Sequence, residues 1–153
     1  MEQEKLKKSA EWEFALALAA LAAEDAQSAL PHIEKALRLR DAPEWYSYLG
    51  YCIARQRGQH RKGLELCQES LAVEPDNPVH FLNLGRIYLA KGDKSEALQT
   101  WRQGMTKGGS PELMQELERL GTRNRPALLS LARSNPLNRY LGLLFSRLGL
   151  RKK

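Results

Sequence analysis

The sequence predicts an all-α protein built from repeated pairs of helices. Two stretches of the chain, 44–78 and 80–111, align with each other, and Gly50 in the first matches Gly85 in the second at a separation of 35 residues. In both copies apolar residues recur at i, i+3 or i+4, which is the spacing of one face of an α-helix. A glycine near the middle of each copy indicates a turn between two helices.

Residues 1–42 are predicted to form an earlier, degenerate copy. Its first helix, over about 3–23, is unusually rich in Ala and lacks the Leu-Gly pair of the later copies. Its second helix contains Pro31, and a proline inside a helix costs about 3 kcal/mol. We therefore expect either a kink at this proline or a helix that begins at Ser28. With this copy the chain has three repeats, about the minimum for a stable solenoid.

The two clear repeats are predicted to span 43–77 and 78–110. In each of them a glycine, Gly58 or Gly92, ends the first helix. Pro75 then breaks the chain between the two repeats. Small residues at the expected helix crossings allow the paired helices to approach closely: Gly50, Gly63, Gly85 and Ala97.

Residues 111–153 are predicted to form three short amphipathic helices that cap the last repeat. The first starts at Ser110-Pro111-Glu112, where a hydroxyl, a proline and an acid are typical of a helix N-terminus, and it ends at Gly121. The other two start near Asn124 and Asn135. The last repeat of a solenoid exposes an apolar face, so an amphipathic segment is needed to cover it.

The positive charge of the chain is concentrated in this C-terminal segment. The net charge is +6, and residues 111–153 hold 9 Lys+Arg against 3 Asp+Glu, which accounts for the whole excess. The basic-patch candidates are Arg133, Arg139, Arg147, Arg151, Lys152 and Lys153. Two explanations stay open: a solvated outer face of the cap, or a surface that docks on anionic membrane or nucleic acid.

The sequence contains no motif of a known catalytic class. It has no Gly-rich phosphate loop, no activated-nucleophile motif and no metal-ligand spacing, so we expect no enzyme, no metal and no cofactor. Cys52 and Cys67 form no CxxC pair and are expected to be core residues. The N-terminus lacks the layout of a signal peptide, and the longest apolar run, 14–23, is too short to span a bilayer. We expect a cytoplasmic protein.

The second clear copy carries the most complete repeat motif: Phe81, Leu84-Gly85, Tyr88, Gly92-Asp93, Glu96-Ala97 and Trp101. These residues resemble the tetratricopeptide repeat (TPR) family, and the whole chain is similar to small bacterial TPR proteins of unassigned role. The second clear copy departs from the family at Gly104, where a packing Ala is expected. The resemblance implies a right-handed solenoid of about three helix pairs.

The resemblance also implies a binding function. In TPR proteins the first helices of successive repeats line a concave groove that holds a peptide or a helix of a partner. The groove candidates in this chain are Ser47, Tyr48, Tyr51, Arg55, Val79, Leu82, Asn83, Arg86 and Leu89. Tyr48 has an alternative role, packing on the neighbouring repeat. Ser47 and Tyr51 stand where chaperone-tail clamps carry Lys and Asn, so such a clamp is not expected.

We therefore predict a non-catalytic adaptor that binds a protein or peptide partner in its groove. A second copy of the chain is an alternative occupant of the groove or of an uncovered end. A function of a different class is an electrostatic anchor, in which the basic segment docks on anionic membrane or nucleic acid while the repeats hold a partner. Nucleic acid is the less favoured ligand, because the repeats are neutral.

Overall fold

The computed structural model describes residues 1–123, which contain seven α-helices, one short 3-10 helix and no strand. In chain order these are α1 (Glu2–Ala22), α2 (Ala26–Leu39), η1 (Pro43–Trp45), α3 (Tyr46–Arg57), α4 (His60–Val73), α5 (Pro78–Lys91), α6 (Lys94–Thr106) and α7 (Pro111–Arg123). Residues Met1–Leu113 form one compact unit, and the chain from Met114 onward belongs to a second. The predicted helices near Asn124 and Asn135 lie outside the described residues.

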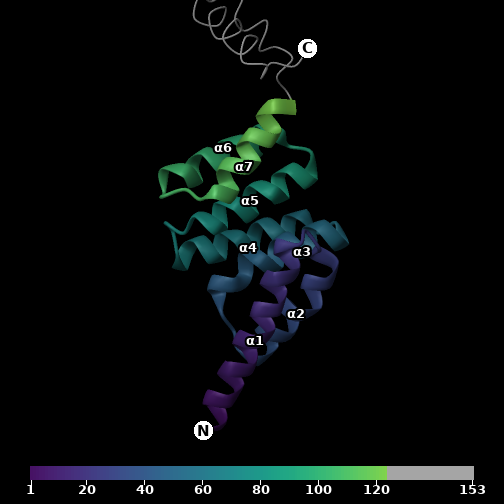
Figure 1. The fold of residues 1–153 in the computed structure, drawn as a ribbon, viewed down its shortest axis with the longest axis vertical. Helices are drawn as coiled ribbons and strands as arrows, with labels where there is room; N and C mark the ends of the chain where they lie inside the picture. The colour runs from purple at the N-terminus through teal and green to yellow at the C-terminus, as the bar shows by residue number, and fades with distance from the viewer. Residues whose placement is uncertain (124–153) are drawn as a thin grey trace, which may run out of the picture. The chain divides into compact units, whose positions relative to one another are not determined.

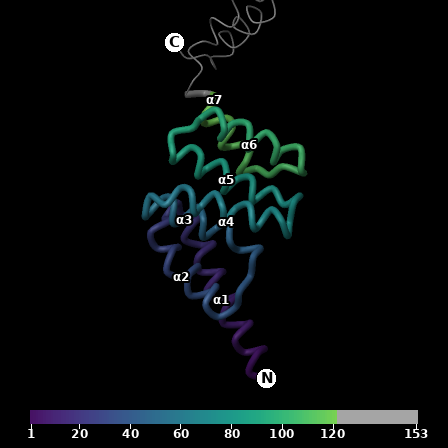
Figure 2. Tube along the Cα trace, turned by 180° about the vertical axis from the view of Figure 1, so that it is seen from behind, coloured from purple at the N-terminus to yellow at the C-terminus, as the bar shows by residue number. Residues whose placement is uncertain are grey.

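The first six helices form three hairpins: α1 with α2, α3 with α4, and α5 with α6 (Figure 1). The hairpins stack in chain order, with α3 against α2 and α5 against both α3 and α4. Figure 2 shows the same stack from behind. This arrangement confirms the all-α solenoid of helix pairs that the repeat pattern predicted.

Two glycines end the first helices of the clear repeats, as predicted. Gly58 has φ +69° and follows α3, and Gly92 has φ +94° and follows α5. Residues with a side chain rarely adopt this left-handed conformation, so glycine is favoured at both turns. After the second turn, the side chain of Asp93 accepts a hydrogen bond from Glu96 N (3.2 Å) and starts α6.

Helix α2 starts two residues earlier than one of the sequence expectations. It begins at Ala26 rather than at Ser28, because Asp25 lies outside the helix and its carboxylate accepts a hydrogen bond from the Ser28 backbone N–H (3.0 Å). Pro31 lies inside the helix and removes the N–H that would bond to the carbonyl of Gln27. Both residues are exposed, so water can take the place of this lost donor.

The degenerate first repeat shares an apolar core with the second. Ala17, Ala29 and Ile33 of the first hairpin are buried together with Cys52 and Ile53 of α3. The small Ala side chains allow α1 and α2 to pack closely, which explains the Ala-rich composition of this hairpin.

Close helix approach in the two clear repeats depends on glycine. A Cβ atom at Gly50 would lie 2.6 Å from the carbonyl oxygen of Gly63, and one at Gly85 would lie 2.1 Å from Nε1 of Trp101. A Cβ at Gly104 would lie 2.7 Å from Cβ of Phe81. The departure from the family's Ala at this position therefore has a steric reason: Cβ of Phe81 and Cδ1 of Leu113 (2.8 Å) occupy the space.

The start of α7 agrees with the sequence, and its end does not. Ser110 Oγ accepts a hydrogen bond from Leu113 N (3.1 Å), as expected for a capping hydroxyl. The helix then continues through Gly121 to Arg123. Gly121 does not have the positive φ with which Gly58 and Gly92 end their helices, so it stays within the helix.

Candidate functional site

The predicted groove candidates lie on α3 and α5, which pack directly against each other. The guanidinium group of Arg86 on α5 lies over the ring of Tyr51 on α3, 5.6 Å from its centroid. Both side chains are half-buried, and Arg55, one helical turn after Tyr51, is exposed. Arg55 makes no ion pair with any residue of the described chain. The structure thus joins an aromatic ring and two cations across the boundary between the two repeats.

The remaining groove candidates divide into surface and interior positions. Val79 and Leu89 are half-buried on α5. Ser47, Leu82 and Asn83 differ from the prediction, since their exposed fractions are only 0%, 5% and 2%. The reason is that α5 contacts both α3 and α4, so a wider arc of α5 is covered than the sequence spacing indicates.

Tyr48 packs against the first repeat, which was the alternative role considered for it. Its ring meets Phe14 of α1 edge-on, with the ring centroids 5.1 Å apart. Phe14 in turn stacks on Trp45 at 4.3 Å. Desolvation raises the pKa of the Tyr48 hydroxyl, so this group stays neutral. Tyr48 is half-buried, and its ring connects the first two repeats.

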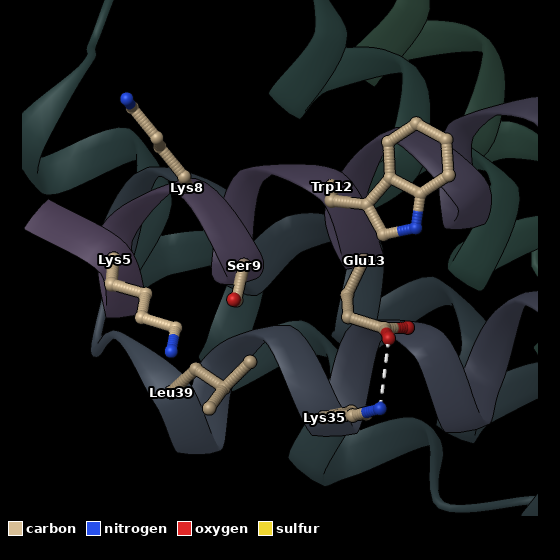
Figure 3. A pocket seen from close by; sticks show the side chains of 7 residues that line it. All are labelled: Lys5, Lys8, Ser9, Trp12, Glu13, Lys35 and Leu39. Atoms are coloured by element: carbon tan, nitrogen blue, oxygen red, sulfur yellow. Dashed lines mark ion pairs between the residues drawn. The ribbon is translucent and has the colours of Figure 1, made fainter.

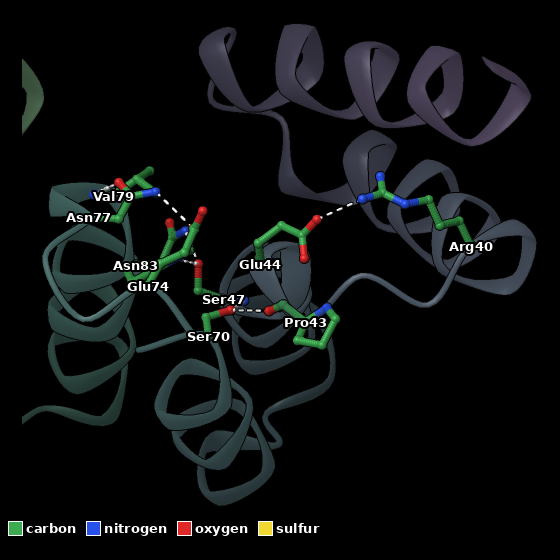
Figure 4. A network of polar contacts seen from close by, with 10 residues as sticks. Arg40, Pro43, Glu44, Ser47, Ser70, Glu74, Asn77, Val79 and Asn83 are labelled. Atoms are coloured by element: carbon green, nitrogen blue, oxygen red, sulfur yellow. Dashed lines mark hydrogen bonds and ion pairs between the residues drawn. The ribbon is translucent and has the colours of Figure 1, made fainter. Parts of the chain in front are cut away.

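The two interior polar candidates belong to a network that connects α3, α4 and α5 (Figure 4). Ser70 Oγ accepts a hydrogen bond from Ser47 N (2.8 Å) and donates one to the carbonyl of Pro43 (2.7 Å). Ser47 Oγ lies 2.7 Å from Nδ1 of His80 and accepts a hydrogen bond from Asn83 Nδ2 (3.0 Å). These buried groups therefore satisfy one another, which is the condition for polar groups in a stable interior.

The acid at the edge of the network determines the proton positions. His80 Nε2 lies 2.7 Å from Glu74 Oε1, and Asn77 Nδ2 donates to the same oxygen (3.0 Å). An ionised carboxylate only accepts, so His80 donates from Nε2 and its Nδ1 accepts the hydroxyl proton of Ser47. Ser47 Oγ is then free to accept from Asn83. A neutral imidazole satisfies every member of the network.

Hydrogen bonds link Ser47 to His80 and His80 to Glu74. A nucleophile, a base and an acid are linked in the same order in a catalytic triad. The side chains of Ser47 and His80 have no exposed surface, however, and Ser47 Oγ already has two partners. A substrate carbonyl has no path to this oxygen in the described structure. We interpret the group as a structural network. Sequence reasoning missed it, although four polar residues on otherwise apolar helix faces are a readable signal.

Protonation of His80 is expected to destabilise the fold. Burial lowers the pKa of His80 below its ordinary value of 6.5, with the neighbouring Glu74 opposing this shift. Below pH 6.5 the unfolded chain therefore binds a proton that the folded chain does not. The free energy of unfolding should be highest above pH 6.5. It should fall toward the lowered pKa with a slope of up to about 1.4 kcal/mol per pH unit.

Urea unfolding followed by circular dichroism between pH 5 and pH 8 measures this slope. The matched variant is His80→Gln, which keeps a polar side chain of similar length but cannot titrate. Its free energy of unfolding should be lower at every pH. This free energy should also change less with pH, because the contribution of the His80 side chain is absent. An identical slope in the two proteins would contradict the attribution of the pH dependence to His80.

Family comparisons reach parts of all three hairpins. Two tetratricopeptide repeat models match the chain, one over residues 14–78 and the other over residues 66–99. Together they extend from α1 to α6 and include the hairpin that the sequence indicated as degenerate. The chain is a tetratricopeptide repeat protein. No curated protein matches its sequence.

TPR repeats generally mediate protein–protein interactions, and the family is typically a non-catalytic interaction module. The described residues of this TPR protein contain no group of three or more His, Cys, Asp or Glu that could hold a metal ion. Cys52 and Cys67 are free and buried, and desolvation raises the pKa of both thiols, so neither is a reactive thiolate.

The basic-patch candidates of the TPR protein lie outside the described residues: Arg133, Arg139, Arg147, Arg151, Lys152 and Lys153. The capping role of residues 111–153 stays a prediction. Among the helices of residues 1–123, none is long and apolar enough to cross a membrane.

Proposed function

We propose that this TPR protein is a non-catalytic adaptor that binds a peptide or a helix of a partner protein over α3 and α5. The observation that carries the proposal is the Tyr51–Arg86 pair, which joins two repeats through a ring and a cation 5.6 Å apart. Arg55 stands one turn along the same helix and is exposed. A cytoplasmic location and a second copy of the chain as an alternative occupant stay predictions.

The chemistry of these residues is that of a binding surface rather than of a catalytic site. Tyr and Arg are enriched among the residues that dominate binding energy, because each combines a large contact area with hydrogen-bond donors. The half-buried Val79 and Leu89 add apolar area on α5. The buried Ser47 and Asn83 would act indirectly, by holding α3 and α5 in register. A partner segment with one or more carboxylates beside apolar residues fits this composition.

The proposal predicts that removal of the surface side chains abolishes partner capture. The full chain and a Tyr51→Ala/Arg55→Ala/Arg86→Ala variant are used as baits in the same affinity pull-down. We expect a partner that is retained by the natural sequence and binds the variant at least about thirtyfold more weakly, the effect of one or more hot-spot residues. Urea unfolding of the variant checks that the fold is intact.

The matched control replaces exposed residues on the second helices: Arg61→Ala, Gln68→Ala and Arg102→Ala. It also removes two cations, so equal loss of the partner from both variants would indicate a non-specific charge effect. Retention of every partner by the Tyr51/Arg55/Arg86 variant would exclude this surface as the binding site.

The electrostatic anchor is the second candidate, and the charge distribution favours it: residues 111–153 carry 9 Lys+Arg and 3 Asp+Glu. The same pull-down separates it from the first candidate when repeated at low and at physiological salt. Binding through phosphate or lipid charges falls steeply with salt, whereas a complex built on Tyr and aliphatic contacts changes little. Capture that survives the triple substitution but is lost at physiological salt would favour the anchor.

A further inference from the structure

An open pocket of about 420 Å³ lies between the N-terminal half of α1 and the C-terminal half of α2 (Figure 3). Lys5, Lys8, Trp12 and Glu13 of α1 line it together with Lys35 and Leu39 of α2. None of the groove candidates on α3 and α5 is among these residues. The pocket is therefore a surface separate from the one on which the proposed function rests.

The charges of the pocket are only partly compensated. Glu13 is nearly buried, and its two carboxylate oxygens are both engaged, one by Lys35 Nζ (2.9 Å) and the other by His32 Nδ1 (2.7 Å). Hydrogen bonds from these two residues lower the pKa of Glu13, so it stays ionised and compensates Lys35. Lys5 and Lys8 form no ion pair within residues 1–123. Both residues line the pocket, and Figure 3 shows their side chains leaving α1 in different directions.

Trp12 adds an apolar surface beside these cations. Its side chain is 65% exposed. The other two tryptophans of the chain, Trp45 and Trp101, are only 7% and 0% exposed. The ring of Trp12 and the side chain of Leu39 come from different helices and border the same pocket. An exposed tryptophan next to uncompensated cations is typical of a surface that meets a partner.

We propose that this pocket binds a short acidic segment of a partner protein. Carboxylates of the segment pair with Lys5 and Lys8, and a large apolar side chain packs between Trp12 and Leu39. Charge complementarity favours this ligand over a polyanion. Residues 1–12 carry three Glu beside three Lys, so the helix has discrete positive positions but no net positive field. A nucleic acid or an anionic membrane needs such a field, whereas separate carboxylates need only the two cations.

Quenching of tryptophan fluorescence by acrylamide tests the proposal, because only Trp12 is exposed. Random short peptides are selected for binding to the full chain, and each selected peptide is assayed for protection of Trp12. We expect acidic peptides with an aromatic or aliphatic residue to protect it. A Lys5→Gln/Lys8→Gln variant should bind them about fivefold more weakly, the combined effect of two exposed ion pairs.

Two control variants make the result specific. Lys7→Gln removes a cation from the same helix outside the pocket lining, and Tyr51→Ala/Arg55→Ala/Arg86→Ala alters the other surface. Both should bind the protecting peptides as the natural sequence does. Loss of binding in the second variant alone would place these peptides on α3 and α5 and overturn the pocket assignment, without affecting the proposed function.

Other outcomes also overturn the proposal. One is that no selected peptide protects Trp12 from the quencher. The other is that peptides with Gln in place of their acidic residues protect it equally well. If protection of Trp12 rises with protein concentration in the absence of any peptide, a second copy of the chain is the occupant of the pocket. Protection by phosphatidylserine vesicles but by no peptide would identify a membrane surface.

Discussion

Replacement of Trp101 by Ala is expected to lower the free energy of unfolding by about 3–5 kcal/mol, the range for loss of a large aromatic side chain from a core. Trp101 has no exposed surface, and its Nε1–H donates to the carbonyl of Leu82 (3.1 Å). The substitution leaves both a cavity and a buried carbonyl without its side-chain donor. Urea unfolding followed by circular dichroism measures the change.

The indole also packs against the backbone of Gly85, and this contact provides a second variant for the same prediction. A Cβ at Gly85 would lie 2.1 Å from Nε1 of Trp101, so Gly85→Ala alone should cost about 1–3 kcal/mol through overpacking. In the Trp101→Ala background the obstacle is absent, and the cost of Gly85→Ala should largely disappear. Strict additivity of the two substitutions would contradict the contact between indole and backbone.

Replacement of Gly50 by Ala is expected to lower the free energy of unfolding by about 3 kcal/mol, the upper end of the usual overpacking range. A Cβ at this position would lie 2.6 Å from the carbonyl oxygen of Gly63, and a Cβ at Gly63 would lie 2.6 Å from the carbonyl oxygen of Gly50. Backbone atoms cannot rotate away as a side chain can, so α3 and α4 must separate. Denaturant unfolding measures the loss.

Gly121→Ala is the matched control for Gly50→Ala. It is also a Gly-to-Ala change inside a helix, but a Cβ there would meet no heavy atom within 4 Å in the described structure. It should raise stability by up to about 1 kcal/mol, because Ala has the higher helix propensity. Equal effects of the two substitutions would mean that α3 and α4 are not in the contact described here.

The Gly50 substitution would also affect the proposed binding surface. Gly50 is adjacent to Tyr51 on α3, and Arg55 lies on the same helix. A shift of α3 away from α4 changes its position relative to Arg86 on α5, because α5 packs against both helices. The groove residues can therefore be altered by a buried glycine, and the pull-down variants leave Gly50 and Gly63 unchanged for this reason.

The repeat architecture was predictable because its signals are local. Gly58 and Gly92 recur at a separation of 34 residues, and apolar residues at helical spacing lie between the turns. Glycine is favoured where the backbone takes a left-handed turn, so these two positions can be recognised without knowledge of their neighbours. Tyr51, Arg55 and Arg86 were expected to line a groove on different grounds, because the resemblance to the TPR family implied a binding surface on these helices.

Burial of the other candidates depended on contacts that the sequence does not contain. Spacing identifies which residues share a face of α5, but Asn83 and Leu82 are interior because α5 touches both α3 and α4. The hydrogen bond between Ser47 and His80 joins residues 33 positions apart, and no local rule predicts it. Trp12 is exposed for the same kind of reason, since no described helix covers its side of α1. Periodicity determined the helices and their order, and helix packing decided which side chains a partner can reach.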